Sequence, residues 1–392
     1  MWRVTTAGES HGKALVAIVE GAPAGLSLSA ADIARDLARR QHGHGRGGRM
    51  AIERDRAELL SGVRQGLTLG SPICLLIPNR DWVNWESAMA AEGTGEASGG
   101  GQESAPSRRP PPGHADQAGA LKYGHHDLRN VLERSSARTT AALVAAGAVA
   151  RKFLAEFGVF CGSHVLAVGG TAAARRPVTP ESLREADASP LRCLDPEAEA
   201  AMCRVIDEAA GRGDTLGGVF EVAVFGLPPG LGSHVAFAER LDGRLAGAVM
   251  AVPAVKGVEV GDGFALAGVP GSQAHDPILP GLARPTNRAG GFEGGMTNGQ
   301  PVIVRAAMKP IPTLRAPLPS VDLDTGGAAP ADFHRSDTCA VAAAAVVAEA
   351  QVLLELASAF SAKFGGDSLA QVRRSFAAYR EEVARWAQPT SS

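Results

Sequence analysis

The sequence is poor in the features that mark several common classes of protein. Aromatic residues make up 5% of its 392 residues, which argues against the base-stacking surfaces that bind single-stranded nucleic acid. The formal net charge is −2, so no overall basic field attracts nucleic acid. The five cysteines are scattered and form no CxxC pair. We therefore predict neither a disulfide framework nor a zinc ribbon.

Signals for export and membrane insertion are also lacking. The first residues, MWRVTTAGESHG, have neither the positive start nor the apolar run of a signal peptide. No uninterrupted apolar span reaches the length needed to cross a membrane. Unpaired cysteines suit a reducing compartment. These observations predict a cytoplasmic protein with no membrane partner.

Lysine is scarce, because six lysines stand against thirty-three arginines. A compositional bias explains most of this skew. Where arginines cluster in glycine-rich loops, however, their bidentate geometry suits phosphate and carboxylate groups. No GxGxxG motif follows a predicted strand, so a dinucleotide-binding domain is not supported.

Two long apolar segments each follow a polar cluster. From about Ser135, residues 141–150 leave no polar face, which predicts a helix buried all round that ends near Gly158. A second apolar helix, interrupted first by Glu349, follows residues 334–338. The start of the first helix suits an anionic ligand, although a simple capped core helix is the alternative.

These two segments and several short strands predict the α+β class. Strands are expected at 2–6, 14–19, 59–63, 72–77, 217–225, 246–252 and 302–306, and a helix at 30–40. The matching triplets at 134–136 and 335–337 suggest a distant duplication, with both long helices central and sheets outside. We expect one domain over residues 1–392, with a flexible insertion at about 92–112, where the sequence is rich in Gly, Ser and Pro.

Candidate chemistry lies in the loops. Four glycines among residues 41–49 would let Arg40, Arg46 and Arg49 converge on a ligand, or the loop is a surface loop with incidental arginines. His11 and His114 are candidate general acids, since imidazole titrates near neutral pH. The histidine pairs at 42/44 and 125/126 lack a completing ligand set, so no metal site is predicted. A triad of Ser10, His11 and Asp116 is disfavoured because adjacent Ser and His cannot readily face each other.

Six motifs together resemble the chorismate synthase family. They are GESHG at 8–12, RRQHGHGRGGRM at 39–50, PGHADQAGALKYGHHDLR at 112–129, ERSSAR at 133–138, NRAGGFEGGMTNGQP at 287–301 and HRSDTCAV at 334–341. The motifs occur in the family's order. The resemblance implies the reaction that forms chorismate, in which 5-enolpyruvylshikimate 3-phosphate loses phosphate and a C6 proton in a 1,4-elimination. This reaction requires reduced FMN without net redox change.

The resemblance also assigns roles to residues. It implies that the substrate's phosphate and carboxylates are bound by Ser10, His11, Arg40, Arg46, Arg49 and Arg134. His11 would protonate the reduced flavin, His114 would assist the leaving phosphate, and Asp337 would serve proton removal through the flavin N5. FMN would be held by Arg134, Ser135, Ser136, Gly294, Lys309, Pro310, Ile311, Pro312, Thr313 and Arg335.

The family further implies a homotetramer whose subunits have a β-α-β sandwich fold with antiparallel sheets around the two central helices. The residues leave open whether the protein reduces its own flavin with NADPH, and an external flavin reductase is favoured. Pro312 stands where the family has a small hydroxyl residue, and Thr139 replaces a usual glutamate. Two alternatives stay open: an inactive homologue that binds FMN or phosphate, and an unrelated anion-binding hydrolase.

Overall fold

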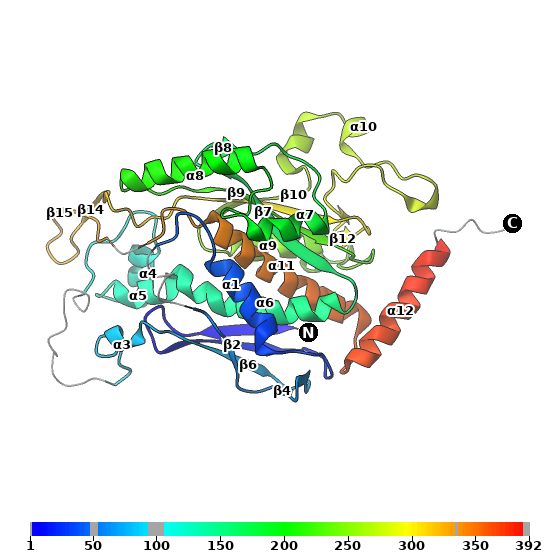
Figure 1. Ribbon diagram of the computed structural model, residues 1–392, viewed down its shortest axis with the longest axis horizontal. Helices are drawn as coiled ribbons and strands as arrows, with labels where there is room; N and C mark the ends of the chain where they lie inside the picture. Colours follow the sequence, from blue (N-terminus) through cyan, green and yellow to red (C-terminus); the bar gives the residue numbers. More distant parts are fainter. Residues whose placement is uncertain (1, 48–53, 93–105, 334–335, 387–392) are drawn as a thin grey trace.

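The computed structural model describes residues 2–47, 54–92, 106–333 and 336–386 (Figure 1). Its N-terminal part forms a four-stranded antiparallel sheet. The strands are β1 (Arg3–Ala7), β2 (Ala14–Glu20), β3 (Glu58–Leu59) and β6 (Ile73–Pro78), in the order β1-β2-β6-β3. Every second residue of β2 and β6 is buried, so this sheet turns one face to the core.

The middle of the chain forms a second, five-stranded sheet. Its strands are β7 (Phe160–Val168), β8 (Thr171–Ala172), β9 (Gly218–Phe225), β10 (Val255–Val260) and β13 (Val302–Met308). The order is β10-β13-β9-β7-β8, and all neighbouring strands are antiparallel.

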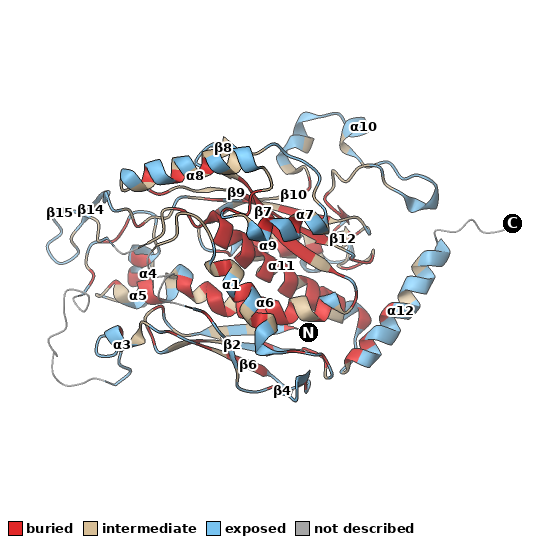
Figure 2. Ribbon diagram, in the orientation of Figure 1, coloured by how far each residue is buried: buried red, intermediate tan, exposed pale blue. Residues whose placement is uncertain are grey.

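Long helices pack on both sheets. They are α1 (Ala30–Gln41), α6 (Thr140–Ala155), α9 (Leu241–Met250) and α11 (Val341–Phe364). α6 contacts β2 and β6, α11 contacts β7 and β9, and α6 and α11 contact each other. Figure 2 shows that most of both helices is buried. A Cβ atom added to Gly147 of α6 would lie 2.4 Å from the Cβ of Ala350, so glycine permits this close crossing.

The remaining elements connect or flank these layers. The helices are α3 (Trp82–Trp85), α4 (Asp116–Tyr123), α5 (Arg129–Ser135), α7 (Pro180–Glu185), α8 (Pro196–Gly211), α10 (Gly271–Ala274) and α12 (Leu369–Trp386), and the 3-10 turns are η2 (Ala137–Thr139), η3 (Ala186–Ala188), η4 (Phe237–Glu239), η5 (Gly263–Gly268) and η6 (Pro280–Leu282). The two-stranded ladders pair β4 (Val63–Arg64) with β5 (Leu67–Thr68), β11 (Phe292–Glu293) with β12 (Met296–Thr297), and β14 (Pro319–Val321) with β15 (Ala328–Pro330). Figure 1 places α3, α4 and α5 at the same end of the molecule.

The predicted α+β class is confirmed, because helices combine with antiparallel sheets. The strand predicted at 246–252 is wrong, since these residues lie in α9 and the turn after it. Leu241, Leu245 and Val249 recur every four residues and are all buried, which is a helical period. The single strand predicted at 59–63 is divided between β3 and β4. Gly62 separates them, with φ of +80° and no room for a side chain beside Ile73.

The starts predicted for the two long helices are also wrong. α6 begins at Thr140 rather than near Ser135, because Ser136 adopts an extended conformation and caps the turn η2. Arg134 and Ser135 therefore belong to the last turn of α5. α11 begins at Val341, four residues after Asp337. The residues predicted to bind a ligand at the N-terminus of a buried helix thus lie in α5 and the turn that follows it.

Other expectations are addressed only in part. In chain order, an antiparallel sheet precedes a long helix twice, in agreement with the duplication hypothesis. Within the predicted insertion, residues 93–105 lie outside the described residues. Ser107 is buried, and the carboxylate of Asp332 accepts hydrogen bonds from its hydroxyl and from the backbone N–H of Arg108. The described end of the segment is therefore fixed to the loop that follows β15.

Among the described residues, one helix is long and apolar enough by composition to cross a membrane. This helix is α11, and 83% of its most apolar window is buried inside the protein. This burial is that of a core helix.

Candidate active site

The first predicted histidine lies in the loop between β1 and β2 and is held by α5. Both carboxylate oxygens of Glu133 contact His11: Oε2 accepts from its backbone N–H at 2.7 Å, and Oε1 lies 2.8 Å from ring atom Nδ1. Glu133 is buried. Its backbone carbonyl accepts the N–H of Ser10 at 2.9 Å. The geometry of this loop thus depends on one residue of α5.

The ring of His11 also has an aromatic neighbour. It stacks on Trp85 of α3, with ring centroids 4.1 Å apart and planes inclined by 29°. The guanidinium of Arg129 lies 4.8 Å from the centroid of Trp85. The imidazole is therefore restrained at its face by Trp85 and at one edge by Glu133.

The second predicted histidine has a similar carboxylate partner. Nδ1 of His114 lies 2.5 Å from Oδ1 of Asp116, at the start of α4. Asp116 is fully buried, and its Oδ2 has no hydrogen-bond partner among the described residues. A buried carboxylate at Nδ1 orients an imidazole. Both candidate acids are therefore His–carboxylate pairs.

A cluster of arginines lies near these loops. Arg40 at the end of α1 is buried; its side chain donates to Thr140 Oγ1 at 2.9 Å and to the carbonyl of Ala137 at 2.7 Å. Arg138 donates to Asp55 Oδ1 at 2.5 Å and to Asn79 Oδ1 at 2.9 Å. Through its amide nitrogen, Asn79 in turn donates to the carbonyls of Glu9 and Gly12. The arginine cluster and the His11 loop are thereby joined.

Guanidinium groups repel one another in this cluster. Burial, the largest effect, and repulsion from Arg46 and Arg138 lower the pKa of Arg40 to about 9, although Asp55 and Asp337 oppose the change. A bound anion would relieve this unfavourable charge, because an opposite charge nearby favours the ionised form of a buried group.

Asp337 joins the arginine loop to the segment before α11. Its Oδ2 lies 2.8 Å from Nη1 of Arg46, and its Oδ1 accepts from the backbone N–H of Gly47 at 2.6 Å. A Cβ at Gly47 would come within 3.0 Å of the carbonyl oxygen of Ser336, so the loop passes closely here. The predicted catalytic Asp337 is therefore brought beside the predicted substrate-binding Arg46.

The segment predicted to hold the cofactor adjoins His114. The ammonium of Lys309 donates to the carbonyl of Gly113. The hydroxyl of Ser336 donates to the carbonyl of Thr313 at 2.8 Å. Residues 309–313, which include Pro310, Ile311 and Pro312, therefore run between the His114 loop and the Ser336–Asp337 segment.

The residues at 134–136, which are also predicted to hold the cofactor, lie at the end of α5 and at the start of the turn η2. Arg134 donates to the carbonyls of Gly8 at 3.1 Å and Thr6 at 2.9 Å. Ser136 accepts from Ser10 Oγ at 3.0 Å. Ser135 donates its hydroxyl to carbonyls within α5, which leaves its oxygen only as an acceptor for a ligand. Two of these three residues thus contact the strand and loop that carry His11.

Three predicted site residues are not joined to these contacts. Gly294 lies in the turn between β11 and β12, and Figure 1 places β12 at the opposite end of the molecule from α4 and α5. Arg49 and Arg335 lie outside the described residues.

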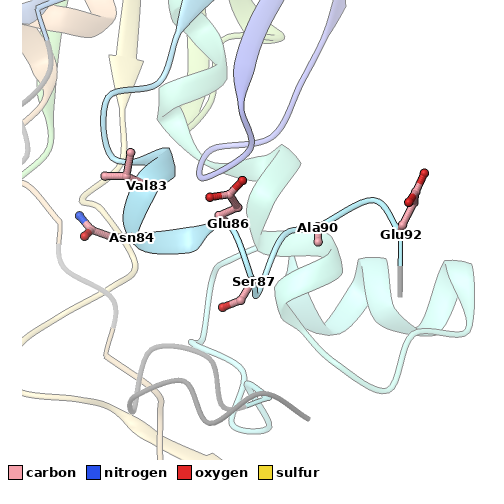
Figure 3. Close-up of a pocket in the computed structure, with 6 residues that line it drawn as sticks. All are labelled: Val83, Asn84, Glu86, Ser87, Ala90 and Glu92. Carbon is pink, nitrogen blue, oxygen red and sulfur yellow. The ribbon is translucent and has the colours of Figure 1, made fainter. Parts of the chain in front are cut away.

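One pocket lies next to this region. It is lined by Val83, Asn84, Glu86, Ser87, Ala90 and Glu92, from α3 and the chain that follows it (Figure 3). Two of its lining residues are glutamates and none is basic. Its charge does not suit an anionic substrate.

Several residues that hold the site together were not identified from the sequence. They are Asp55, Asn79, Trp85, Arg129 and Glu133. Glu133 lies 122 positions from its partner His11, a distance that no local pattern can bridge. Asp116 did carry a signal, since an acidic residue two positions after a loop histidine can reach its ring.

The fold and the site define a class of protein: an α+β enzyme for a small anionic substrate, with paired histidines and carboxylates at a loop-built site. A family model described as chorismate synthase matches residues 2–360. The chorismate synthase of Moorella thermoacetica is 56% identical over 388 residues, covering 97% of this chain and 99% of that protein. That of Mycobacterium avium is 55% identical, covering 100% and 99%.

A solved structure agrees with these relatives. A crystal structure of chorismate synthase superimposes with a TM-score of 0.78 and 42% identity, covering 98% of both chains. The chain belongs to the chorismate synthase family. Its activity is chorismate synthase activity, a carbon–oxygen lyase reaction, and nothing in these comparisons supports an inactive homologue. Membership of the family implies a small-molecule substrate and a flavin cofactor.

Proposed function

We propose that the chain forms chorismate from 5-enolpyruvylshikimate 3-phosphate with reduced FMN bound, and that the arginine cluster holds the substrate. The convergence of the guanidinium groups of Arg46 and Arg138 on buried Arg40, whose pKa they lower, carries this proposal. A phosphate or carboxylate placed among Arg40, Arg46 and Arg138 accepts charge-assisted hydrogen bonds, which are about twice as strong as neutral ones. Ser10, Arg49 and Arg134 complete the proposed set of substrate ligands.

The chain's own groups account for both proton steps. His114, oriented by Asp116, donates a proton to the phosphate as it leaves. Asp337, whose carboxylate contacts Arg46, serves the removal of the proton from C6. His11, oriented by Glu133, keeps the cofactor in the protonation state that the reaction needs.

The described residues fit a flavin phosphate and an anionic ring in part. Lys309 and Arg134 supply positive charge, while Ser136 and residues 310–313 supply polar backbone and side-chain atoms on either side of the site. Pro312 has no N–H, so it contributes none of these donors. Reduced FMN would supply electron density that assists loss of phosphate and would be regenerated at the end. We propose that Gly294 and Arg335 also contribute to this site.

Phosphate release under anaerobic conditions tests the proposal. With reduced FMN the protein is expected to release phosphate and form chorismate in equal amounts, and with oxidised FMN neither. Binding of FMN without phosphate release would instead identify an inactive homologue. Phosphate release that does not depend on reduced FMN would identify an anion-binding hydrolase.

We further propose a cytoplasmic homotetramer with the sandwich arrangement, in which α6 and α11 lie between the two sheets. Large apolar side chains are exposed between residues 235 and 282; they include Val235, Phe237, Phe264, Ile278, Leu279 and Leu282. Such a concentration marks a surface covered by a protein partner. Light scattering after gel filtration measures the assembly.

The source of the reduced flavin is a separate question. We propose an external flavin reductase, because no strand followed by GxGxxG occurs in the sequence. Anaerobic incubation of the purified protein with NADPH and FMN is expected to leave FMN oxidised. Bleaching of the flavin absorbance would show that the protein reduces its own cofactor.

A further inference from the structure

Both carboxylate oxygens of Glu133 contact His11. Oε2 accepts from the backbone N–H of His11 at 2.7 Å, while Oε1 lies 2.8 Å from Nδ1 of the same residue. A carboxylate that is ionised can only accept hydrogen bonds. The contact at Oε1 therefore requires the proton of a neutral His11 ring to sit on Nδ1.

The surroundings make Glu133 a rigid support. The residue is 2% exposed and lies in α5, and its backbone carbonyl accepts the N–H of Ser10. Nη1 of Arg129, one helical turn earlier, lies 3.8 Å from Oε1 and balances its charge. Trp85 restrains the face of the imidazole, so the ring cannot easily turn away from the carboxylate.

We propose that Glu133 is a positioning residue that fixes the tautomer of His11 and assigns proton transfer to Nε2. The inference rests on the proposed role of His11 as an acid. In that role the Nε2–H bond breaks, the proton passes to the acceptor, and His11 is left neutral with its remaining proton on Nδ1. No further reactant is needed, because the return of a proton to Nε2 restores the cation.

Replacement by glutamine reverses the pattern of hydrogen bonds. The single carbonyl oxygen of glutamine must satisfy the backbone N–H of His11, since a buried N–H without an acceptor is unfavourable. The amide NH₂ then faces Nδ1 and can only donate to it. Glu133→Gln is therefore expected to move the ring proton of neutral His11 from Nδ1 to Nε2, with little change in the shape of the loop.

A matched control lies in the other sheet. His164 Nε2 and Glu221 Oε1 are 3.3 Å apart, both residues are buried, and they pair across β7 and β9. Glu221→Gln makes the same change at a second His–Glu pair. Glu221→Gln is expected to leave kcat unchanged. A loss of stability that follows from breaking any buried His–Glu pair would appear in both variants.

The tautomer is measured by magic-angle-spinning ¹⁵N spectra of histidine-labelled protein, with His11→Asn used for assignment. Wild-type protein should show the Nδ1–H form of neutral His11, and Glu133→Gln the Nε2–H form. Turnover of Glu133→Gln is expected to fall about 10²-fold in kcat, with KM within about threefold. Glu133→Asp should restore part of the lost turnover.

An Nε2–H form in the wild-type protein overturns the proposal, and this result is available even if the glutamine variant does not fold. Unchanged kcat in a variant whose tautomer has switched also overturns it. The spectra need no substrate. Absence of turnover in the wild-type protein would therefore refute the proposed function without deciding the role of Glu133.

Discussion

Glu349 is a carboxylate buried in the middle of the apolar helix α11, and its removal should destabilise the fold. Arg39 contacts it bidentately, with both distances 2.8 Å. Nη2 of Arg151 and Oγ of Ser163 each lie 2.5 Å from a carboxylate oxygen. Burial alone would raise the pKa of Glu349, but the guanidiniums of Arg39, Arg151 and Arg192 outweigh it and hold the pKa well below its usual range.

Glu349→Gln keeps one acceptor oxygen and replaces the other with an NH₂ group. In the wild-type protein Oε2 accepts from Arg39 and Arg151. An amide NH₂ group at this position would therefore face two guanidinium donors. Breaking a buried ion pair by removing one partner costs about 3–5 kcal/mol. We expect a loss of this size in the free energy of unfolding at pH 7.

Urea denaturation followed by circular dichroism at fixed protein concentration measures the loss. Glu355→Gln is the control, since Glu355 lies on the same helix and pairs with Arg244, but its side chain is 32% exposed. Exposed pairs contribute about 0–1 kcal/mol. A similar effect of the two substitutions would refute the reasoning from burial.

The dependence on pH has a definite sign. The pKa of Glu349 is lower in the folded than in the unfolded protein, so its ionised form stabilises the fold. This contribution is complete above the unfolded pKa of about 4.3 and is lost as pH falls below it. The difference in stability between wild-type protein and Glu349→Gln should therefore shrink on acidification below about pH 4.

Three further predictions concern the site and the insertion. Arg46→Ala should raise KM by about 10- to 100-fold, because each charge-assisted hydrogen bond contributes about 1.5–3 kcal/mol. The melting temperature should change little. A lower melting temperature with unchanged KM would contradict this prediction. Deletion of Glu96 to Ser104 should leave the protein soluble with an unchanged oligomeric state in gel filtration, since Gly-, Ser- and Pro-rich sequence cannot bury a core. Asp337→Asn should retain flavin binding by fluorescence titration but lose about 10²–10⁴-fold in single-turnover phosphate release.

The fold was predictable where the sequence carries a local period. Residues 141–150 and 341–348 contain hardly any polar side chain, and both segments form buried helices. The helix α9 was not predicted from the sequence. Glycines and alanines lie between its three buried apolar residues and make the helical pattern weak. Helix starts were misplaced because a serine at 135 or 136 can cap a helix or a 3-10 turn with the same side chain.

The site was predictable as motifs but not as contacts. The composition of the loops singled out His11, His114 and the arginines, and the resemblance to a family assigned their roles. Nothing in a loop sequence specifies the partners of these residues. Asp55 and Arg138 lie 83 positions apart and meet at 2.5 Å. Such pairs depend on how α1, α6 and the first sheet pack. Carboxylates that lie far along the chain from their partners therefore cannot be assigned to a site from a single sequence.

Asp337 shows why these contacts change the interpretation of an experiment. In the structure α11 begins at Val341, and Asp337 contacts Arg46 and the N–H of Gly47. Asparagine can still accept from Gly47 but cannot neutralise Arg46. A purely structural role would therefore raise KM through Arg46 and leave single-turnover release intact at saturating substrate. Loss of release at saturation, with KM unchanged, requires the carboxylate itself to take up the proton.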